Sequence, residues 1–253
     1  MTTPRLTRRN HGKGHSYRLD EKRRPGVTTI IDRALPKPAL IDWAARATAE
    51  AAVDRWDELG QLSPSRRLRE LQQARWATTK AASLRGVLIH DYAEGLVHGR
   101  PVDVPAEHLG PVESVARFID RWRIEPIATE APVANTVQQY CGTVDGLFTF
   151  GGGDPVLLDW KTGGVFNEAA LQAAGYVHCD LWQPNGPESE QPMPTVERAY
   201  IAKILSDDVQ LLPVVDLDQL WLQFRYLLAT WHWLQAVEDE PAIGNAIEPE
   251  PVR

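Results

Sequence analysis

The sequence predicts an α/β fold in which a small mixed β-sheet is flanked by helices and carries a helical elaboration on its N-terminal side. Apolar residues follow helical spacing through most of residues 39–122, whereas residues 126–161 alternate apolar residues with polar or small ones. A further helix at about 167–181 separates this region from two strands, at 196–205 and 209–215, and a last helix at about 217–237. Strands that alternate with helices in this way are typical of one α/β domain.

The first half of the chain is predicted to be mainly helical. Residues 1–24 are polar, basic and non-periodic, and they lead into a short β-like segment at residues 26–31, Gly-Val-Thr-Thr-Ile-Ile. Helices are expected at about residues 39–59, 64–82, 83–99 and 107–122. Pro36 and Pro38 precede the first of them, and Gly99-Arg100-Pro101 ends the third.

Three strands are expected in the middle of the chain, at residues 126–134, 138–150 and 156–161. The sequence Gly-Gly-Gly-Asp-Pro at residues 151–155 is a strong turn signal between the second and the third. These two strands are therefore expected to form a hairpin.

Length and charge suggest the domain organisation. A chain of 253 residues suits one large domain, and 43% hydrophobic residues with 24% charged ones exclude a disordered or fibrous protein. We expect a basic flexible arm at residues 1–24, a single folded domain at 25–239, and an acidic, proline-rich tail at 240–253. The net charge is −7, yet residues 1–24 hold eight basic residues against two acidic ones. This segment and a second basic run, from Arg66 to Arg85, are either solvated faces or surfaces that attract DNA.

The sequence also limits the location and the cofactors that we expect. No stretch approaches the roughly 20 apolar residues of a membrane span, and the N-terminus has no apolar signal-peptide core, so we expect a cytoplasmic protein without a membrane partner. The two cysteines, Cys141 and Cys179, lack zinc spacing and are too few for a four-cysteine iron–sulfur cluster. We expect no such cluster.

Two acids and a lysine gather at the predicted hairpin. Asp145 lies in one strand, and Asp159 and Lys161 lie two residues apart in the next, so the latter two leave the same face while Trp160 leaves the other. Hydrolysis of a phosphodiester needs a cation that activates water, ligands that hold the cation, and a positive group near the transition state. Asp145, Asp159 and the backbone carbonyl of Trp160 would hold Mg²⁺ or Mn²⁺, and Lys161 would orient the attacking water. Whether Lys161 also removes the proton depends on its pKa.

Four short motifs in order extend this cluster. They are Gly86-x-x-x-His90, Gly142-Thr-Val-Asp145, Asp159-Trp-Lys161-Thr162 and Gln172-x-x-x-Tyr176. In this set the chain resembles the RecB-like branch of the PD-(D/E)xK nuclease superfamily, most clearly at residues 142–176. The resemblance implies a restriction-endonuclease-like core, in which His90 is a metal ligand and Gln172 and Tyr176 organise the site and contact DNA. Glu130, in the preceding strand, is an additional candidate, since relatives of this branch often carry an acid there.

The resemblance implies a metal-dependent DNA exonuclease of the cluster-free phage type, acting in recombination, repair or phage replication, in the host cytoplasm if it is phage-encoded. DNA is the expected partner, together with a single-strand-annealing protein or a helicase by analogy, because the chain has no helicase P-loop of its own. A structure-selective or restriction-like endonuclease would use the same chemistry. An inactive, nuclease-derived DNA-binding module is a second alternative.

Overall fold

The structure is a computed structural model that describes residues 5–11, 14–244 and 246, without the side chains of Arg75 and residues 77–83. Its centre is a seven-stranded sheet with the order β10-β9-β6-β5-β4-β7-β8. Neighbouring strands are antiparallel except β6 and β9, which are parallel, so the sheet is mixed. The strands are β4 (Ile124–Asn135), β5 (Tyr140–Phe150), β6 (Val156–Lys161), β7 (Leu181–Trp182), β8 (Gln191–Pro192), β9 (Arg198–Ile204) and β10 (Val209–Pro213).

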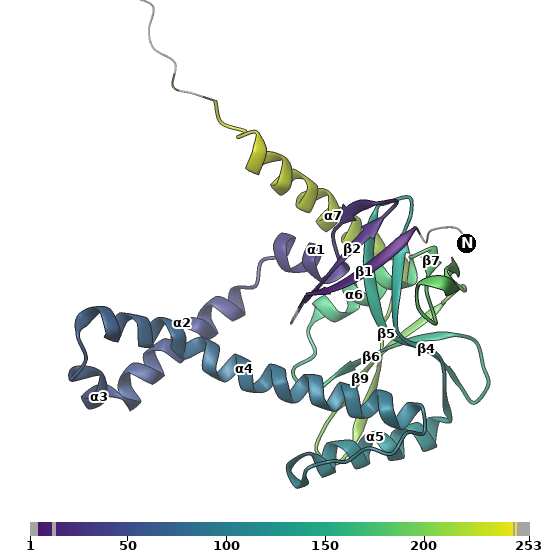
Figure 1. Cartoon of the computed structure of the whole chain (residues 1–253), viewed down its shortest axis with the longest axis horizontal. Helices are drawn as coiled ribbons and strands as arrows, with labels where there is room; N and C mark the ends of the chain where they lie inside the picture. Colours follow the sequence, from purple (N-terminus) through teal and green to yellow (C-terminus); the bar gives the residue numbers. More distant parts are fainter. Residues whose placement is uncertain (1–4, 12–13, 245, 247–253) are drawn as a thin grey trace, which may run out of the picture.

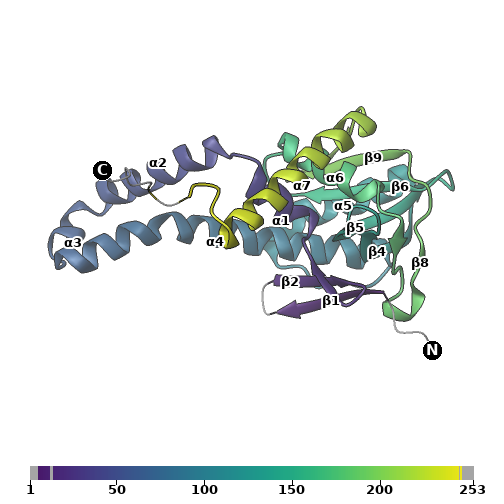
Figure 2. The same cartoon turned by 90° about the horizontal axis from the view of Figure 1, so that it is seen from above.

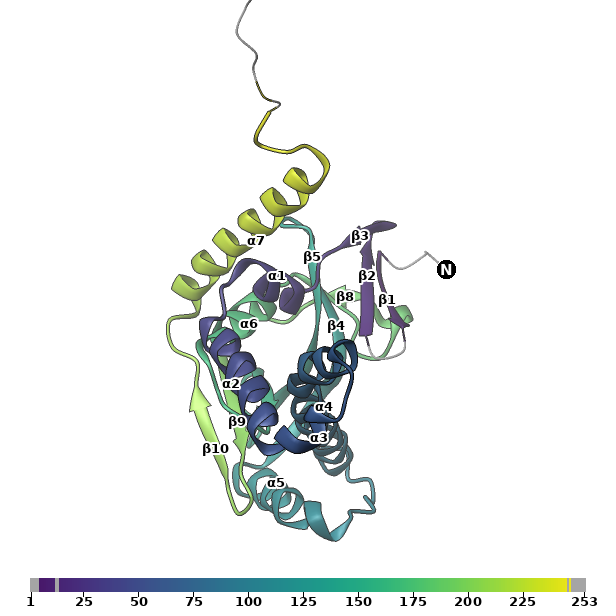
Figure 3. The ribbon, with the colours of Figure 1, turned by 90° about the vertical axis from the view of Figure 1, so that its left-hand side faces the viewer.

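Helices cover both faces of this sheet. On one face lie α1 (Val27–Ala34), α6 (Asn167–Val177) and α7 (Leu217–Asp239), which share an apolar core with Leu147 and Leu157. On the other lie α5 (Leu109–Trp122) and the C-terminal half of α4 (Pro64–Val97), packed against Phe148 and Leu158 (Figure 3). Successive residues of β5 and β6 thus enter different cores, as the alternation of a pleated strand requires. The predicted mixed sheet flanked by helices is confirmed.

A helical arm projects from this body. It consists of α2 (Pro38–Asp54), α3 (Trp56–Gly60) and the N-terminal half of α4, with α2 and α4 side by side (Figures 1 and 2). No residue of α2 is buried. The helices expected at 64–82 and 83–99 are one continuous helix, because no proline or glycine interrupts the chain between Pro64 and Gly86. Two short 3₁₀ turns, η1 (Ala106–His108) and η2 (Pro187–Ser189), complete the helices.

The expectation of a flexible arm at residues 1–24 is wrong for the residues that the structure describes there. They form a three-stranded antiparallel sheet of β1 (Leu6–His11), β2 (Gly14–Leu19) and β3 (Lys22–Arg24). Leu6 and Leu19 are register partners and are fully buried against Ala134 and Cys141. A few apolar side chains are enough here because the surface that buries them comes from β4 and β5.

The expectation of a strand at residues 26–31 is also wrong, because Val27–Ala34 is helix α1. The β-branched composition favours a strand, but Val27, Ile30 and Ile31 have the i, i+3, i+4 spacing of one helix face and are buried. Tertiary burial therefore overrides local propensity. Most of the tail expected at 240–253 lies outside the described residues.

In the described part of the chain, none of the helices has the length and apolar character needed to cross a membrane.

Candidate active site

The candidate site lies where β5 and β6 stop pairing. Their ladder ends at Gly146 opposite Leu158, while β6 stays paired with β9 as far as Lys161. Asp145, the residue before Gly146, is the first residue of β5 outside this ladder. Its Oδ2 accepts a hydrogen bond of 3.0 Å from the backbone N–H of Trp160. The Asp145 carboxylate thus takes the place of a strand partner and is fixed beside β6.

Asp159 and Lys161 stand on the face of β6 that α1 and α6 cover. Nζ of Lys161 lies 2.5 Å from Oδ2 of Asp159, an ion pair with Asp159 almost fully buried. Oδ1 of Asp159 is buried and has no hydrogen-bonding partner within the described structure. Trp160 points to the other face, with its ring centroid 5.9 Å from that of Phe118 and 6.4 Å from that of Phe148.

His90 reaches the site from α4 on the opposite face. Its Nδ1 lies 3.7 Å from Oδ2 of Asp145. His90, Asp145 and Trp160 line a small cavity of about 10 Å³ together with Glu94 and Glu130. A cavity of this size holds about one water molecule or one cation.

Glu130 takes up its position through an unusual backbone. Its φ is 49°, in the left-handed region that residues other than glycine rarely adopt. Burial raises the pKa of its carboxyl group, and the nearby Glu94 raises it further, while Arg8 lowers it. Glu130, the additional candidate from the sequence, lines the same small cavity as His90 and Asp145.

Two residues at the site were missed by the sequence analysis. Glu94 lies four residues after His90 on α4, and this i, i+4 spacing could have indicated it. Arg8 on β1 places Nη1 3.5 Å from Oε2 of Glu130 and 3.4 Å from its backbone oxygen. Nothing in the sequence indicated Arg8, because its segment was expected to be flexible.

Several carboxylates lie close together at this site, and the pKa values of Asp145 and Asp159 are raised. Burial raises the pKa of Asp145 to about 6, against the opposing effects of Lys161 and the Trp160 amide. Burial and the neighbouring Asp145 raise the pKa of Asp159 to about 7. Burial also lowers the pKa of His90, and Lys161 adds to that effect. Such crowding of buried acids is a feature of sites that bind cations or perform proton chemistry.

Lys161 is stabilised in its charged form by Asp159 and Asp145. Burial opposes the ammonium form, but Asp159 and Asp145 together outweigh burial, so the pKa of Lys161 is raised. Lys161 is therefore protonated at neutral pH in this arrangement. It can donate hydrogen bonds and neutralise negative charge, but it cannot accept a proton.

The glycines of two motifs make room for residues of the other two. A Cβ at Gly142 would lie 2.4 Å from Cε1 of Tyr176, and a Cβ at Gly86 would lie 3.1 Å from Oγ1 of Thr162. The hydroxyl of Tyr176 in turn accepts a hydrogen bond of 3.0 Å from Nε2 of Gln172. The four motifs thus contact one another across α4, β5, β6 and α6.

In the Gln172-x-x-x-Tyr176 motif, only Gln172 lines a cavity. Tyr176 is buried at 4% exposure, so it supports the site from inside the protein. Gln172 lines a cavity of about 210 Å³ together with Lys161, Thr28, Lys37 and the exposed ring of Phe166. Lys161 is therefore accessible from this cavity.

The contact between Gly142 and Tyr176 leads to a stability prediction. Gly142→Ala is expected to lower the free energy of unfolding by about 1–3 kcal/mol, because the added methyl group forces the buried Tyr176 ring to move. Thermal unfolding would show this as a lower Tm. Gly60→Ala is the matched control, since a Cβ there meets no atom within 4 Å. Equal Tm values for the two variants would contradict this packing.

The fit of the residues to a divalent cation rests on oxygen donors. In the described part of the chain, no three His, Cys, Asp or Glu side chains already stand in the arrangement of a metal site. The unpartnered Oδ1 of Asp159, the carboxylates of the small cavity and the Trp160 carbonyl nevertheless suit Mg²⁺ or Mn²⁺. Cys141 and Cys179 are buried and free.

The side chains of the basic run from Arg66 to Arg85 lie in different environments. Arg67 donates to the backbone oxygen of Leu59 at the tip of the arm, while Arg66, Arg69 and Arg85 are exposed on α4. The side chains of Arg75 and Lys80 lie outside the described residues.

Comparison of the sequence with models of protein families gives no match, and comparison with curated proteins gives no relative.

Proposed function

We propose that the chain is a metal-dependent deoxyribonuclease with a restriction-endonuclease-like core, of the RecB-like branch of the PD-(D/E)xK superfamily. The observation that carries this proposal is the meeting of Asp145, Asp159 and Lys161 at the end of the β5–β6 ladder, with His90 of α4 beside them. A buried pair of carboxylates with raised pKa values and one lysine supports phosphodiester chemistry more than it supports a structural role.

Under this proposal His90, Asp145, Asp159 and the Trp160 carbonyl would hold Mg²⁺ or Mn²⁺, with Glu130 as an additional oxygen donor. The bound cation would polarise the phosphate and lower the pKa of a water molecule. The hydrogen bond from the Trp160 amide holds the Asp145 carboxylate in place for this role. The mixed set of nitrogen and oxygen donors suits Mn²⁺ as well as Mg²⁺.

Lys161 acts in the proposal as a fixed positive charge. Its ammonium group opens onto the cavity with Gln172 and Phe166, where a phosphate would lie. Being protonated, it would orient the attacking water through a hydrogen bond and stabilise the charge that grows on the phosphate oxygens. Gln172 is held by Tyr176, so its amide is a rigid polar wall of the same cavity.

We propose exonucleolytic action in recombination, repair or phage replication, with DNA as the partner and a single-strand-annealing protein or helicase acting with it. This choice between modes follows from the family resemblance. An endonuclease would use the same residues, so the mode must be measured on DNA with and without ends.

The test is digestion of end-labelled linear DNA and closed circular DNA by the purified chain with Mg²⁺, Mn²⁺ or EDTA. The expected result is degradation of linear DNA alone, which EDTA and the isosteric Asp145→Asn variant both abolish. The label then reports strand polarity. Cutting of circles would establish an endonuclease instead. DNA binding without cleavage in either metal would contradict an enzyme and establish a binding module.

A further inference from the structure

A second, strongly basic hollow lies beside the candidate active site. It has a volume of about 690 Å³ and is lined by residues of β2, β3, the start of α1 and the C-terminal half of α7. In Figure 3, α1 lies between α7 and the strands β2 and β3. Arg23, Arg24 and Arg33 line it, and none of its lining residues is acidic. The hollow therefore concentrates positive charge in a chain whose net charge is −7.

The arginines of this basic hollow have few partners. Arg23 and Arg24 form no ion pair within 4 Å with a carboxylate of the described residues, and Nε of Arg24 is buried without a hydrogen-bonding partner. Arg33 lies 3.7 Å from Glu238, and both of these side chains are mostly exposed. A buried N–H that has lost water and gained no acceptor is costly, so an anion with several oxygens would stabilise this arrangement.

The start of α1 adds donors to the same wall. The helix begins at Val27 after Gly26, which offers no side-chain cap, and no acidic residue lies in its first turn. Its first backbone N–H groups therefore lack intrahelical partners and carry the positive end of the helix dipole. Thr28 and Thr29 of this turn line the hollow. Guanidinium groups, hydroxyls and helix amides together are the donors that bind phosphate.

The basic hollow and the active-site cavity share a wall. Thr28 lines both the hollow and the cavity that contains Lys161 and Gln172. A strand whose phosphate lies at Lys161 can therefore continue past the start of α1 into the hollow. Trp231 of α7 offers an aromatic wall there, on which a base or sugar can pack.

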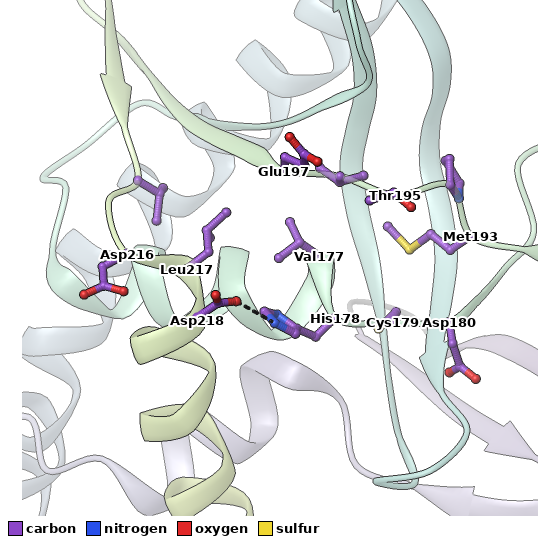
Figure 4. Close-up of a pocket in the computed structure, with 13 residues that line it drawn as sticks. Val177, His178, Cys179, Asp180, Met193, Thr195, Glu197, Asp216, Leu217 and Asp218 are labelled. Carbon is purple, nitrogen blue, oxygen red and sulfur yellow. Dashed lines mark ion pairs between the residues drawn. The ribbon is translucent and has the colours of Figure 1, made fainter.

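Another large hollow shows the opposite chemistry. It has a volume of about 640 Å³ and lies where the end of α6 meets the start of α7 (Figure 4). Four acids line it, Asp180, Glu197, Asp216 and Asp218, and His178 points toward Asp218 at 3.7 Å. Such a site repels phosphate, whereas the basic hollow attracts it and shares Thr28 with the cavity that contains Lys161.

We infer that the basic hollow binds a phosphate group of the nucleic-acid strand whose scissile bond lies at Lys161, with Arg23, Arg24 and the start of α1 as its donors. This inference rests on the proposed function for its substrate. The phosphate is either an internal one of the backbone or a terminal one, and both present the same oxygens to the hollow.

The test measures binding of a fluorescent single-stranded oligonucleotide in EDTA over a series of NaCl concentrations. Arg23→Gln/Arg24→Gln is expected to weaken binding about tenfold near physiological salt and to reduce the salt dependence by about one to two released counterions. Arg33→Gln, which changes an exposed residue, is a second variant with the same expected direction. Arg18→Gln is the control, because Arg18 lies on the same small sheet but donates to the Glu21 carbonyl outside the hollow.

Oligonucleotides with a 5′-phosphate, a 3′-phosphate or hydroxyl ends distinguish the two sources of the phosphate. A loss confined to one phosphorylated end identifies a terminal phosphate, and an equal loss for all identifies a backbone phosphate. Either result supports the inference. Binding of both arginine variants within twofold of the wild type, with an unchanged salt dependence, would overturn it. Because EDTA removes cleavage from the measurement, failure of the proposed nuclease function would instead appear as normal binding without cleavage when Mn²⁺ is added.

Discussion

Under the proposed nuclease function, replacing Lys161 by alanine is expected to lower the rate of DNA cleavage by about 10²–10³-fold, the usual effect of removing one group that stabilises transition-state charge. Lys161 lines the same cavity as Gln172, and its ammonium is held by Asp159. DNA binding in EDTA should change little, because one charge among many phosphate contacts is lost. The measurement is the single-turnover cleavage rate in saturating Mn²⁺, where substrate binding does not limit the rate.

Two further lysine variants sharpen this prediction. Lys203 is the register partner of Lys161 on β9, and it makes no ion pair with a carboxylate in the described structure. Lys203→Ala removes the same charge from the neighbouring strand, and we expect it to lower the rate by less than about tenfold. Lys161→Arg keeps a charge but not the compact geometry, so its rate should fall between those of the wild type and Lys161→Ala. Equal rates for Lys161→Ala and Lys203→Ala would refute a specific role of Lys161.

The central part of the site could be predicted from the sequence because it depends on local regularities. Alternation along β6 puts Asp159 and Lys161 on one face, and a turn at residues 151–155 brings β5 next to β6. The sequence does not show that β5 and β6 stop pairing at Gly146, nor that the Asp145 carboxylate then accepts the Trp160 amide. It also left the protonation of Lys161 open, since the pKa depends on burial and on two carboxylates from different strands.

The parts that the sequence did not predict are built by contacts between distant segments. Leu6 and Leu19 have too few apolar neighbours in sequence to suggest a sheet, and β4 and β5 supply the surface that buries them. Arg8 reaches Glu130 only because β1 is ordered in this way. The helix α1 replaces a predicted strand for the same reason, because its buried face packs against α6 and α7. Local propensity carries no information about such partners.

The metal-free protein is expected to lose stability as the pH rises from about 4 to about 7, through Asp145 and Asp159. Their pKa values in the folded protein, about 6 and about 7, lie above the value near 4 of an unfolded chain. In this window the folded protein binds more protons than the unfolded one, so raising the pH favours unfolding. The raised pKa of Glu130 acts in the same direction. The lowered pKa values of His90, His15, Asp20 and Glu58 act in the opposite direction.

Asp159→Asn isolates this effect, because asparagine mimics the protonated acid. The difference in Tm between the variant and the wild type, both without metal, should be small at pH 5 and should favour the variant by a few degrees at pH 8. Mn²⁺ should reverse the order at pH 8. A cation present at about 100 times its Kd stabilises the wild type by about 2.7 kcal/mol, or roughly 5–10 °C for a chain of this length, and the variant lacks a ligand for it. At pH 5 protons compete with the cation for both carboxylates, so the Mn²⁺ shift of the wild type should be much smaller. A wild-type shift of the same size at both pH values, or one that Asp159→Asn retains, would place the cation away from Asp159.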